Sequence, residues 1–159
     1  MNDTESTGSS PDGMTMTAGS TPTSRALTVV AAVVAAVVVN LIVYAIGRAA
    51  GGSFTFTPDG EPVVVGAMTV AAFSALPMLV GLTAVALLAR FGWVKRTAMI
   101  VGPVLAAGTI LVMTLPQNLD GISKTALSVC HLTLIPIILA AVPRLATAST
   151  RRGTVPAGR

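Results

Sequence analysis

Four long stretches of the sequence carry no charged residue, and they constrain the fold more than any other feature. They cover residues 26–46, 66–89, 98–115 and 125–142. An α-helix rises about 1.5 Å per residue, so that about 20 apolar residues cross a hydrocarbon core roughly 30 Å thick. Val and Ile are abundant, but in lipid every backbone group needs a hydrogen-bond partner, which excludes isolated strands. The sequence therefore predicts an all-α membrane protein, a bundle of four transmembrane helices.

The composition agrees with a membrane protein and excludes a soluble one. Charged residues make up 10% of the 159 residues and the mean hydropathy is +0.81, whereas soluble domains carry about 25% charged residues. The pI of about 10.2 reflects ten Lys and Arg against only six Asp and Glu. This is a scarcity of acid and not a basic patch. We therefore expect the lipid bilayer, and no nucleic acid, as a partner.

Polar tails flank the apolar region. Residues 1–24 are rich in Ser, Thr, Gly and Pro and show no apolar periodicity, and residues 146–159 form a short basic tail. Such segments bury too little apolar surface to fold. We expect both tails to be disordered in the cytoplasm, and residues 25–145 to form one transmembrane domain.

Basic residues in the connections indicate the orientation of the bundle, because they collect on the cytoplasmic side of a membrane. Four helices place eight of the ten basic residues on one side: Arg25, Arg90, Lys95, Arg96, Arg144, Arg151, Arg152 and Arg159. Only Arg48 and Lys124 fall on the other side. The sequence therefore predicts a multi-pass protein of the bacterial inner membrane with both termini in the cytoplasm.

The link between the second and third segments combines an indole ring with three cations. It holds Arg90, Trp93, Lys95 and Arg96 within seven residues. Trp is enriched at the depth of the lipid headgroups, and Lys and Arg beside it attract anionic lipid. We expect these four residues to form an interfacial anchor on the cytoplasmic side.

The link between the first two segments, SFTFTPDGEPVVV at residues 53–65, has the pattern of a β-hairpin. Phe54 and Phe56 alternate with Thr, a turn follows at Pro58-Asp59-Gly60, and a run of Val returns. Pro presets φ at the second turn position and Gly accepts a positive φ. An isolated hairpin is marginal in water. We therefore expect a short extracytoplasmic β-hairpin that lies against the helix ends, with both Phe rings facing the membrane.

The last apolar segment carries a pattern of small residues, His-Leu and aliphatic-Pro that ends in Arg. It comprises residues 126–132, Ile135-Pro136 and Pro143-Arg144. Together with the polar tail, the Ala/Val-rich first helix, the outer hairpin and the basic inner loop, residues 25–145 resemble an uncharacterised family of actinobacterial four-helix membrane proteins. The sequence departs from the family pattern at Cys130, where Met is expected. The resemblance implies a four-helix inner-membrane protein and contributes no activity and no catalytic residue.

The apolar segments offer little material for catalysis. They contain no Asp or Glu, a single cysteine, Cys130, and a single histidine, His131. One cysteine excludes an intramolecular disulfide and a cysteine-based zinc site, and the sequence has no metalloprotease or phosphate-binding motif. We therefore expect no catalytic residue, no metal site, no cofactor and no enzymatic activity.

Each segment holds one polar residue at a similar depth: Asn40, Thr69, Thr109 and His131. We expect a polar layer about 9 Å below the outer helix ends, in which His131 bonds Asn40 or a backbone carbonyl. Lys124, Ser128 and His131 are spaced by four and three residues and share one helix face. Two interpretations stay open: an outward-facing polar pocket that titrates near neutral pH, or interhelical hydrogen bonds that hold the bundle.

Two functions fit these features. The leading hypothesis is a structural or accessory component of the bacterial cell envelope without enzymatic activity, paired with a second copy of itself or with another membrane protein. Small residues at four-residue spacing, such as Ala32/Ala36 and Gly102/Ala106, permit the close helix approach that such contacts need. The alternative is a small transporter or sensor with a polar pocket around His131.

Overall fold

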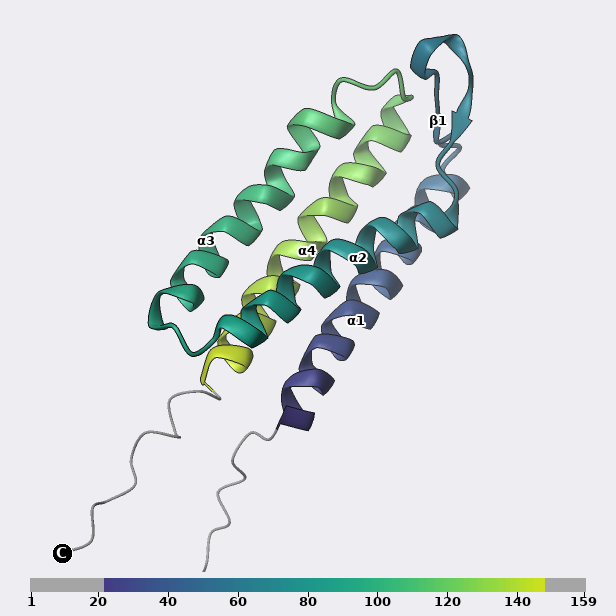
Figure 1. Ribbon diagram of the computed structural model, residues 1–159. Coiled ribbons are helices and arrows are strands. Elements are labelled where there is room, and N and C mark those ends of the chain that lie inside the picture. Colours follow the sequence, from purple (N-terminus) through teal and green to yellow (C-terminus); the bar gives the residue numbers. More distant parts are fainter. Residues whose placement is uncertain (1–21, 148–159) are drawn as a thin grey trace, which may run out of the picture.

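The structure of the protein, a computed structural model, describes residues 22–147 (Figure 1). Within them, four helices are each long and apolar enough to cross a membrane, so the chain is a multi-pass membrane protein. The helices are α1 (Pro22–Ala49), α2 (Ala67–Leu88), α3 (Gly92–Thr109) and α4 (Gly121–Thr147). A π-helical turn, η2 (Ile110–Thr114), continues α3. Most of the tails predicted at residues 1–24 and 146–159 lies outside the described residues.

The helices differ in length from the apolar segments that predict them. α1 and α4 have 28 and 27 residues, and α4 begins at Gly121, ahead of its apolar segment. α3 begins at Gly92, so that Trp93, Lys95 and Arg96 lie in its first turns and not in a link. Hydropathy marks only the part of a helix inside the hydrocarbon, whereas backbone hydrogen bonding continues through the polar residues of the interface.

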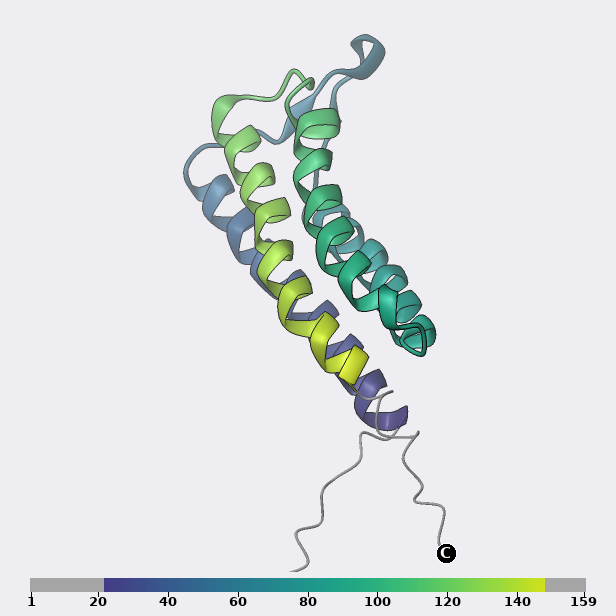
Figure 2. The same cartoon turned by 90° about the vertical axis from the view of Figure 1, so that its left-hand side faces the viewer.

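The four helices form an open arrangement around α1 and α4. α1 packs against α2 and α4, and α4 packs against α3, whereas α2 and α3 make few contacts with each other. Figure 1 shows α2 and α3 diverging from the link that joins them. Pro22 and Thr147 lie at the same end of the bundle (Figure 2), which we call the terminal end. The opposite end, which carries the link between α1 and α2, is the hairpin end.

Small residues set the closest helix contacts. Ala32 and Ala36 of α1 are buried in the core. On α3, a Cβ added at Gly102 would lie 2.9 Å from Cγ2 of Ile138 on α4, so that glycine lets the two helices approach. Transmembrane helices have no hydrophobic driving force between them and associate through such close packing. The four-residue spacing of small residues therefore coincides with helix contacts in the folded chain.

The link between α1 and α2 contains a hairpin of only two short strands. β1 (Thr55–Phe56) pairs antiparallel with β2 (Val63–Val64), with Thr55 opposite Val64. A 3₁₀ turn, η1 (Pro58–Gly60), joins them, and its glycine has a φ of 88°, a conformation that glycine adopts at low cost. Val63 and Val64 stay exposed, so the hairpin gains little from packing and remains short.

Phe54, the residue before β1, is inserted between α1 and α4. Its side chain is 0% exposed, and its ring meets that of Tyr44 edge-on with centroids 4.7 Å apart. A Cβ added at Gly47 would lie 2.8 Å from Phe54 Cζ and 2.8 Å from Ala126 Cβ, so only glycine fits this contact. The sequence predicts that Phe54 lies against the helix ends. In the structure its side chain is instead buried between α1 and α4.

A hydrogen-bonded cluster of Ser53, Asp120 and Ser123, the hairpin-end cluster, ties the segment before β1 to the start of α4. Asp120 Oδ2 accepts from the hydroxyl of Ser123 at 2.6 Å, the hydroxyl of Ser53 at 2.7 Å and the Ser53 N–H at 3.0 Å. Its Oδ1 accepts from the Ser123 N–H at 2.9 Å, which makes Asp120 an N-terminal cap of α4. Ser123 Oγ accepts from the Phe54 N–H at 2.8 Å, and Arg48 donates to the Ser53 carbonyl at 2.8 Å.

These hydrogen bonds favour the charged form of the carboxyl group. Those from the Ser123 and Ser53 hydroxyls, followed by that from the Ser123 N–H, hold the pKa of Asp120 well below its ordinary value. A negative charge is also stabilised at a helix N-terminus. The ionised Asp120 side chain therefore holds the hairpin end of α4 against the end of α1.

We expect Asp120→Asn to lower the melting temperature of the purified protein at neutral pH, because the amide offers one acceptor oxygen and no charge. The pKa of Asp120 is lowered in the folded state. Its stabilisation is therefore fully present above the ordinary Asp pKa of about 3.9 and is lost as the pH falls below that value. Melting temperatures measured in detergent should fall more steeply on acidification for the wild type than for the variant.

Glu61→Gln is the matched control, since Glu61 lies exposed beside the hairpin turn. We expect it to keep both the melting temperature and the acid profile of the wild type. An Asp120→Asn protein with the same melting temperature and the same acid profile as the wild type would contradict the stabilising role of the hairpin-end cluster.

Candidate functional site

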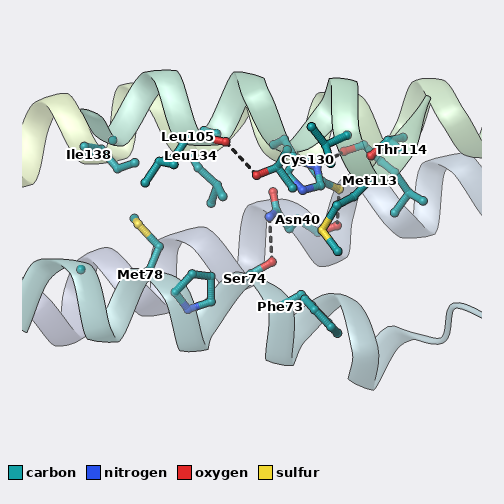
Figure 3. Close-up of a pocket in the computed structure, with 18 of the residues that line it drawn as sticks. Asn40, Phe73, Ser74, Met78, Leu105, Met113, Thr114, Cys130, Leu134 and Ile138 are labelled. Atoms are coloured by element: carbon teal, nitrogen blue, oxygen red, sulfur yellow. Dashed lines mark hydrogen bonds between the residues drawn. The ribbon is translucent and has the colours of Figure 1, made fainter. Parts of the chain in front are cut away.

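A groove lies between α2 and α3, where the two helices diverge. Its cavity has a volume of about 980 Å³ and extends from Trp93, near the terminal end, to Phe56 and Gln117 at the hairpin end. Figure 3 shows lining side chains from all four helices, among them Asn40 of α1 and Leu134 of α4. We call this cavity the α2–α3 groove.

The rim of the groove carries large apolar side chains that no other part of the bundle covers. Phe73 of α2, Leu105 of α3 and Val112 of η2 line the groove and are exposed. In a chain that crosses a membrane, exposed apolar side chains at this height face lipid tails. The α2–α3 groove is therefore open to the hydrocarbon of the bilayer.

The lining of the groove is uncharged and divided into two halves. Within the described part of the chain, no Asp, Glu, Lys or Arg lines it. Apart from Thr97, its polar residues lie in the half nearer the hairpin end: Asn40, Thr69, Ser74, Thr109, Thr114, Gln117 and His131. Met78, Leu134 and Ile138 belong to the apolar half. Among the residues described, no three His, Cys, Asp or Glu side chains are grouped as metal ligands would be.

A chain of hydrogen bonds around Asn40 joins three helices. Asn40 is 2% exposed, and its Nδ2 donates to Ser74 Oγ of α2 at 2.8 Å (Figure 3). Its Oδ1 accepts from Thr133 Oγ1 of α4 at 2.6 Å, and Ser74 donates onward to the Val70 carbonyl at 2.7 Å. A buried amide in an apolar region is costly unless it is hydrogen-bonded, so this chain fixes α1, α2 and α4 relative to one another.

His131 is bonded to its own helix. Its Nδ1 lies 2.8 Å from the carbonyl oxygen of Leu127. A carbonyl only accepts, so Nδ1 carries the proton, and in the neutral ring Nε2 is left as an acceptor. Of the two partners expected for His131, Asn40 and a backbone carbonyl, the structure shows the carbonyl. The ring is half-buried and lines the groove.

The ends of α1 and α4 lie farther from these two residues than the ends of the apolar segments do. His131 follows the first residue of α4, Gly121, by ten positions, and Asn40 precedes the last residue of α1, Ala49, by nine. These separations correspond to about 15 and 14 Å along the helix axis, against the expected depth of about 9 Å. Because both helices extend beyond their apolar segments, Asn40 and His131 keep the expected depth of about 9 Å within the apolar part.

The other predicted pocket residues are divided between the groove and its surroundings. Thr69 is exposed and lines the groove, and Thr109 lines it while donating to the Leu105 carbonyl at 2.7 Å. Lys124 and Ser128 are half-buried on α4 and are not among the lining residues. The stripe of Lys124, Ser128 and His131 thus meets the groove only at the histidine.

The predicted interfacial anchor lies at the terminal end of the groove. Trp93 is exposed and lines the groove there, with its ring centroid 6.4 Å from that of Phe91. The guanidinium of Arg90 stacks over Phe91 at 4.7 Å from the ring centroid, and Lys95 and Arg96 are exposed. An indole ring beside cations is typical of a helix end at the membrane interface.

Comparison with known proteins gives a family and no function. The sequence matches the "family of unknown function (DUF6069)" over residues 20–148. The chain belongs to the DUF6069 family. The matched range contains all four helices and every residue of the α2–α3 groove. No curated protein and no solved structure matches this DUF6069 protein.

Two residues of the hydrogen-bond chain, Ser74 and Thr133, were missed by reasoning from the sequence. Thr133 lies two positions from His131, or about 200° around the helix, and so falls off the face that the histidine marks. A signal was present nonetheless. The Asn40 amide inside an apolar segment needs both a donor and an acceptor, and a Ser and a Thr on neighbouring helices supply them.

We expect Thr133→Val in the DUF6069 protein to lower the free energy of unfolding by about 0.6–2 kcal/mol, the range of interhelical hydrogen bonds in membranes. The substitution keeps the size of the side chain and removes the donor to Asn40 Oδ1. Thr133→Ser, which keeps the hydroxyl, should recover most of the loss. The measurement is reversible unfolding in mixed detergent micelles.

Thr125→Val on the same helix is the control. The Thr125 hydroxyl is exposed and donates only to the Gly121 carbonyl of its own helix at 2.8 Å. We expect a change within about 0.5 kcal/mol, as for other surface substitutions. Equal effects of Thr125→Val and Thr133→Val would show that the hydrogen bond to Asn40 does not stabilise the bundle.

Proposed function

We propose that this protein is a non-enzymatic accessory component of the bacterial cell membrane that binds an apolar membrane molecule in its α2–α3 groove. The observation that carries the proposal is the groove itself, a cavity of about 980 Å³ that is uncharged and open to the bilayer. Ligand sites of proteins are typically apolar cavities of about 300–1,000 Å³ with a few polar groups. The α2–α3 groove has this size and this distribution of polarity.

The charges of the bundle support a cytoplasmic terminal end. In the described chain, Arg25, Arg90, Lys95, Arg96 and Arg144 lie on elements at that end. Asp120, Arg48, Lys124 and Glu61 lie at the hairpin end. Basic residues collect on the cytoplasmic side, so we place both termini there and the hairpin outside. The resemblance to actinobacterial membrane proteins supports a bacterial cell membrane.

The lining chemistry supports binding and not catalysis. His131 is the one histidine of the described lining, and its Nδ1 is engaged by the Leu127 carbonyl. General acid–base catalysis needs groups positioned to give and to take a proton, and among the described residues no carboxylate or amine lines the groove beside the histidine. This lining supports an accessory protein that binds a membrane component in the groove.

Site-specific photo-crosslinking in native membranes tests the proposal. A photoreactive amino acid at Ala84, an exposed residue that lines the groove, should yield adducts enriched in one membrane molecule. The same amino acid at Ala107, an exposed residue of α3 outside the lining, samples bulk lipid. Identical adduct distributions at the two positions, measured by mass spectrometry, would refute a binding role of the groove.

A small transporter or sensor is the second candidate, favoured by the presence of Asn40 and His131 in the lining of a cavity that reaches Gln117. In a Cys130→Ser background, a membrane-impermeant thiol reagent added from the hairpin side separates the two functions. A lipid-facing groove predicts that Gln117→Cys reacts and His131→Cys does not, because the apolar walls exclude water. Reaction at both positions would show a water-filled path and favour the transporter or sensor.

A further inference from the structure

The geometry of the groove points to a class of ligand: a long-chain alcohol, with its hydroxyl group between Asn40 and His131 and its hydrocarbon tail in the apolar half. This inference rests on the proposed function and specifies the molecule that the groove holds. It follows from three properties of the lining, namely its neutrality, its free donor and acceptor, and the shape of its walls.

The neutrality of the lining excludes a charged head group. No Asp, Glu, Lys or Arg lines the groove within the described chain, and Asn40 and His131 lie about 14–15 Å along the helices from the hairpin end. An ion at that depth without a counter-charge pays a large desolvation penalty. Phosphate, carboxylate and ammonium head groups are therefore poorly matched to the polar half of the groove.

The polar half offers one donor and one acceptor that no described residue uses. The Asn40 amide has two N–H groups, of which one donates to Ser74 Oγ, while its oxygen accepts from Thr133. His131 donates through Nδ1 to the Leu127 carbonyl and leaves Nε2 as an acceptor. A hydroxyl group accepts one hydrogen bond and donates another, whereas a ketone or ester oxygen only accepts and a hydrocarbon does neither.

The backbone of Asn40 contacts the helical turn that carries His131. The Cys130 thiol donates to the backbone carbonyl oxygen of Asn40 at 3.6 Å, and His131 is the next residue of α4. Both Asn40 and His131 line the same cavity, and Figure 3 shows Asn40 between Ser74 and Cys130. We infer that a hydroxyl group bound at this point of the groove accepts from the spare amide N–H and donates to the ring nitrogen.

The walls favour a flexible tail over a transmembrane helix as the occupant. From the polar half, the lining continues along Leu134 and Ile138 of α4 and Val101 of α3 towards Trp93. Helices that pack closely in membranes meet through small residues, whereas the wall formed by α3 and η2 carries Trp93, Val101, Leu105 and Val112. A flexible hydrocarbon chain can adapt to such an irregular wall. The apolar half of the groove begins next to the position of the hydroxyl group, so the tail of the alcohol can lie along it.

The test uses the full-length protein in bilayer nanodiscs and a long-chain alcohol with a photoreactive diazirine in its chain. Unlabelled hexadecanol, hexadecane and palmitate compete at equal mole fraction in the bilayer. We expect hexadecanol to compete about tenfold better than either analogue, the factor that one net hydrogen bond contributes to affinity. Competition by hexadecane equal to that of hexadecanol would overturn the assignment of the hydroxyl group, and stronger competition by palmitate would overturn the argument from neutrality.

Variants locate the two parts of the ligand. Asn40 also holds three helices together, so His131→Leu is the variant that tests the head group. We expect it to abolish the preference for hexadecanol over hexadecane, and His131→Gln, which keeps an acceptor, to restore part of it. Gly81→Leu should block the tail, since Gly81 lines the groove and a Cβ there meets nothing within 4 Å. Gly108→Leu, equally open and outside the lining, should label like the wild type.

The outcomes separate this inference from the proposed function. If no alcohol labels the groove saturably while Ala84 crosslinks show another enriched molecule, the ligand class is wrong and the binding role stands. If Ala84 also gives the adducts of bulk lipid, both are wrong. A His131→Leu protein that keeps the full preference for hexadecanol would refute the placement of the hydroxyl group.

Discussion

The carboxamide of Asn40 is buried among apolar helices, and the arrangement of the bundle depends on which side chains form hydrogen bonds with it. Its amide donates to Ser74 of α2 and accepts from Thr133 of α4, so α2 and α4 are held on either side of α1. α3 then packs mainly on α4. Because α2 is bonded to α1, it diverges from α3, and the α2–α3 groove is the space that this geometry leaves open.

The hairpin end provides a second constraint, which makes α1 and α4 the rigid pair of the bundle. Phe54 fills the contact that Gly47 opens beside Ala126, and Asp120 ties Ser53 to the first turn of α4. The charge of Asp120 lies outside the hydrocarbon, where hydrogen bonds and the helix N-terminus stabilise it. α2 packs mainly on α1, and α3 packs mainly on α4. A ligand in the groove is therefore bordered by two helices that make few contacts with each other.

Much of this fold is predictable because membrane insertion depends on composition. The absence of charge over four long segments predicts four helices, and Pro58-Asp59-Gly60 predicts the turn of the hairpin. The small residues at Gly102 and Ala106 predict a close approach, since only their size matters for it. The helix ends are less accessible to such reasoning, because Gly121 and Pro22 lie outside the apolar segments, where hydropathy carries no information.

The candidate site was only partly accessible from the sequence. Asn40 and His131 stand out because polar groups in lipid are rare. Their partners depend on which helices face each other, and Ser74 and Thr133 look unremarkable along the chain. The divergence of α2 and α3, which creates the groove, leaves no local signal, because it results from contacts that each helix makes with α1 or α4. The buried position of Phe54 also leaves no local signal in the sequence. The space for its ring is formed by Gly47 and Ala126, which lie on two different helices.

The distribution of polarity along the groove has a functional consequence. Hydrogen-bonding groups at one half and apolar walls at the other give a bound amphiphile a single orientation, with its head towards the hairpin end. The head is recognised by the direction of two hydrogen bonds, whereas the tail is held by contact area that does not distinguish one chain from another. A site of this kind selects its ligand by the head group and tolerates variation in the tail.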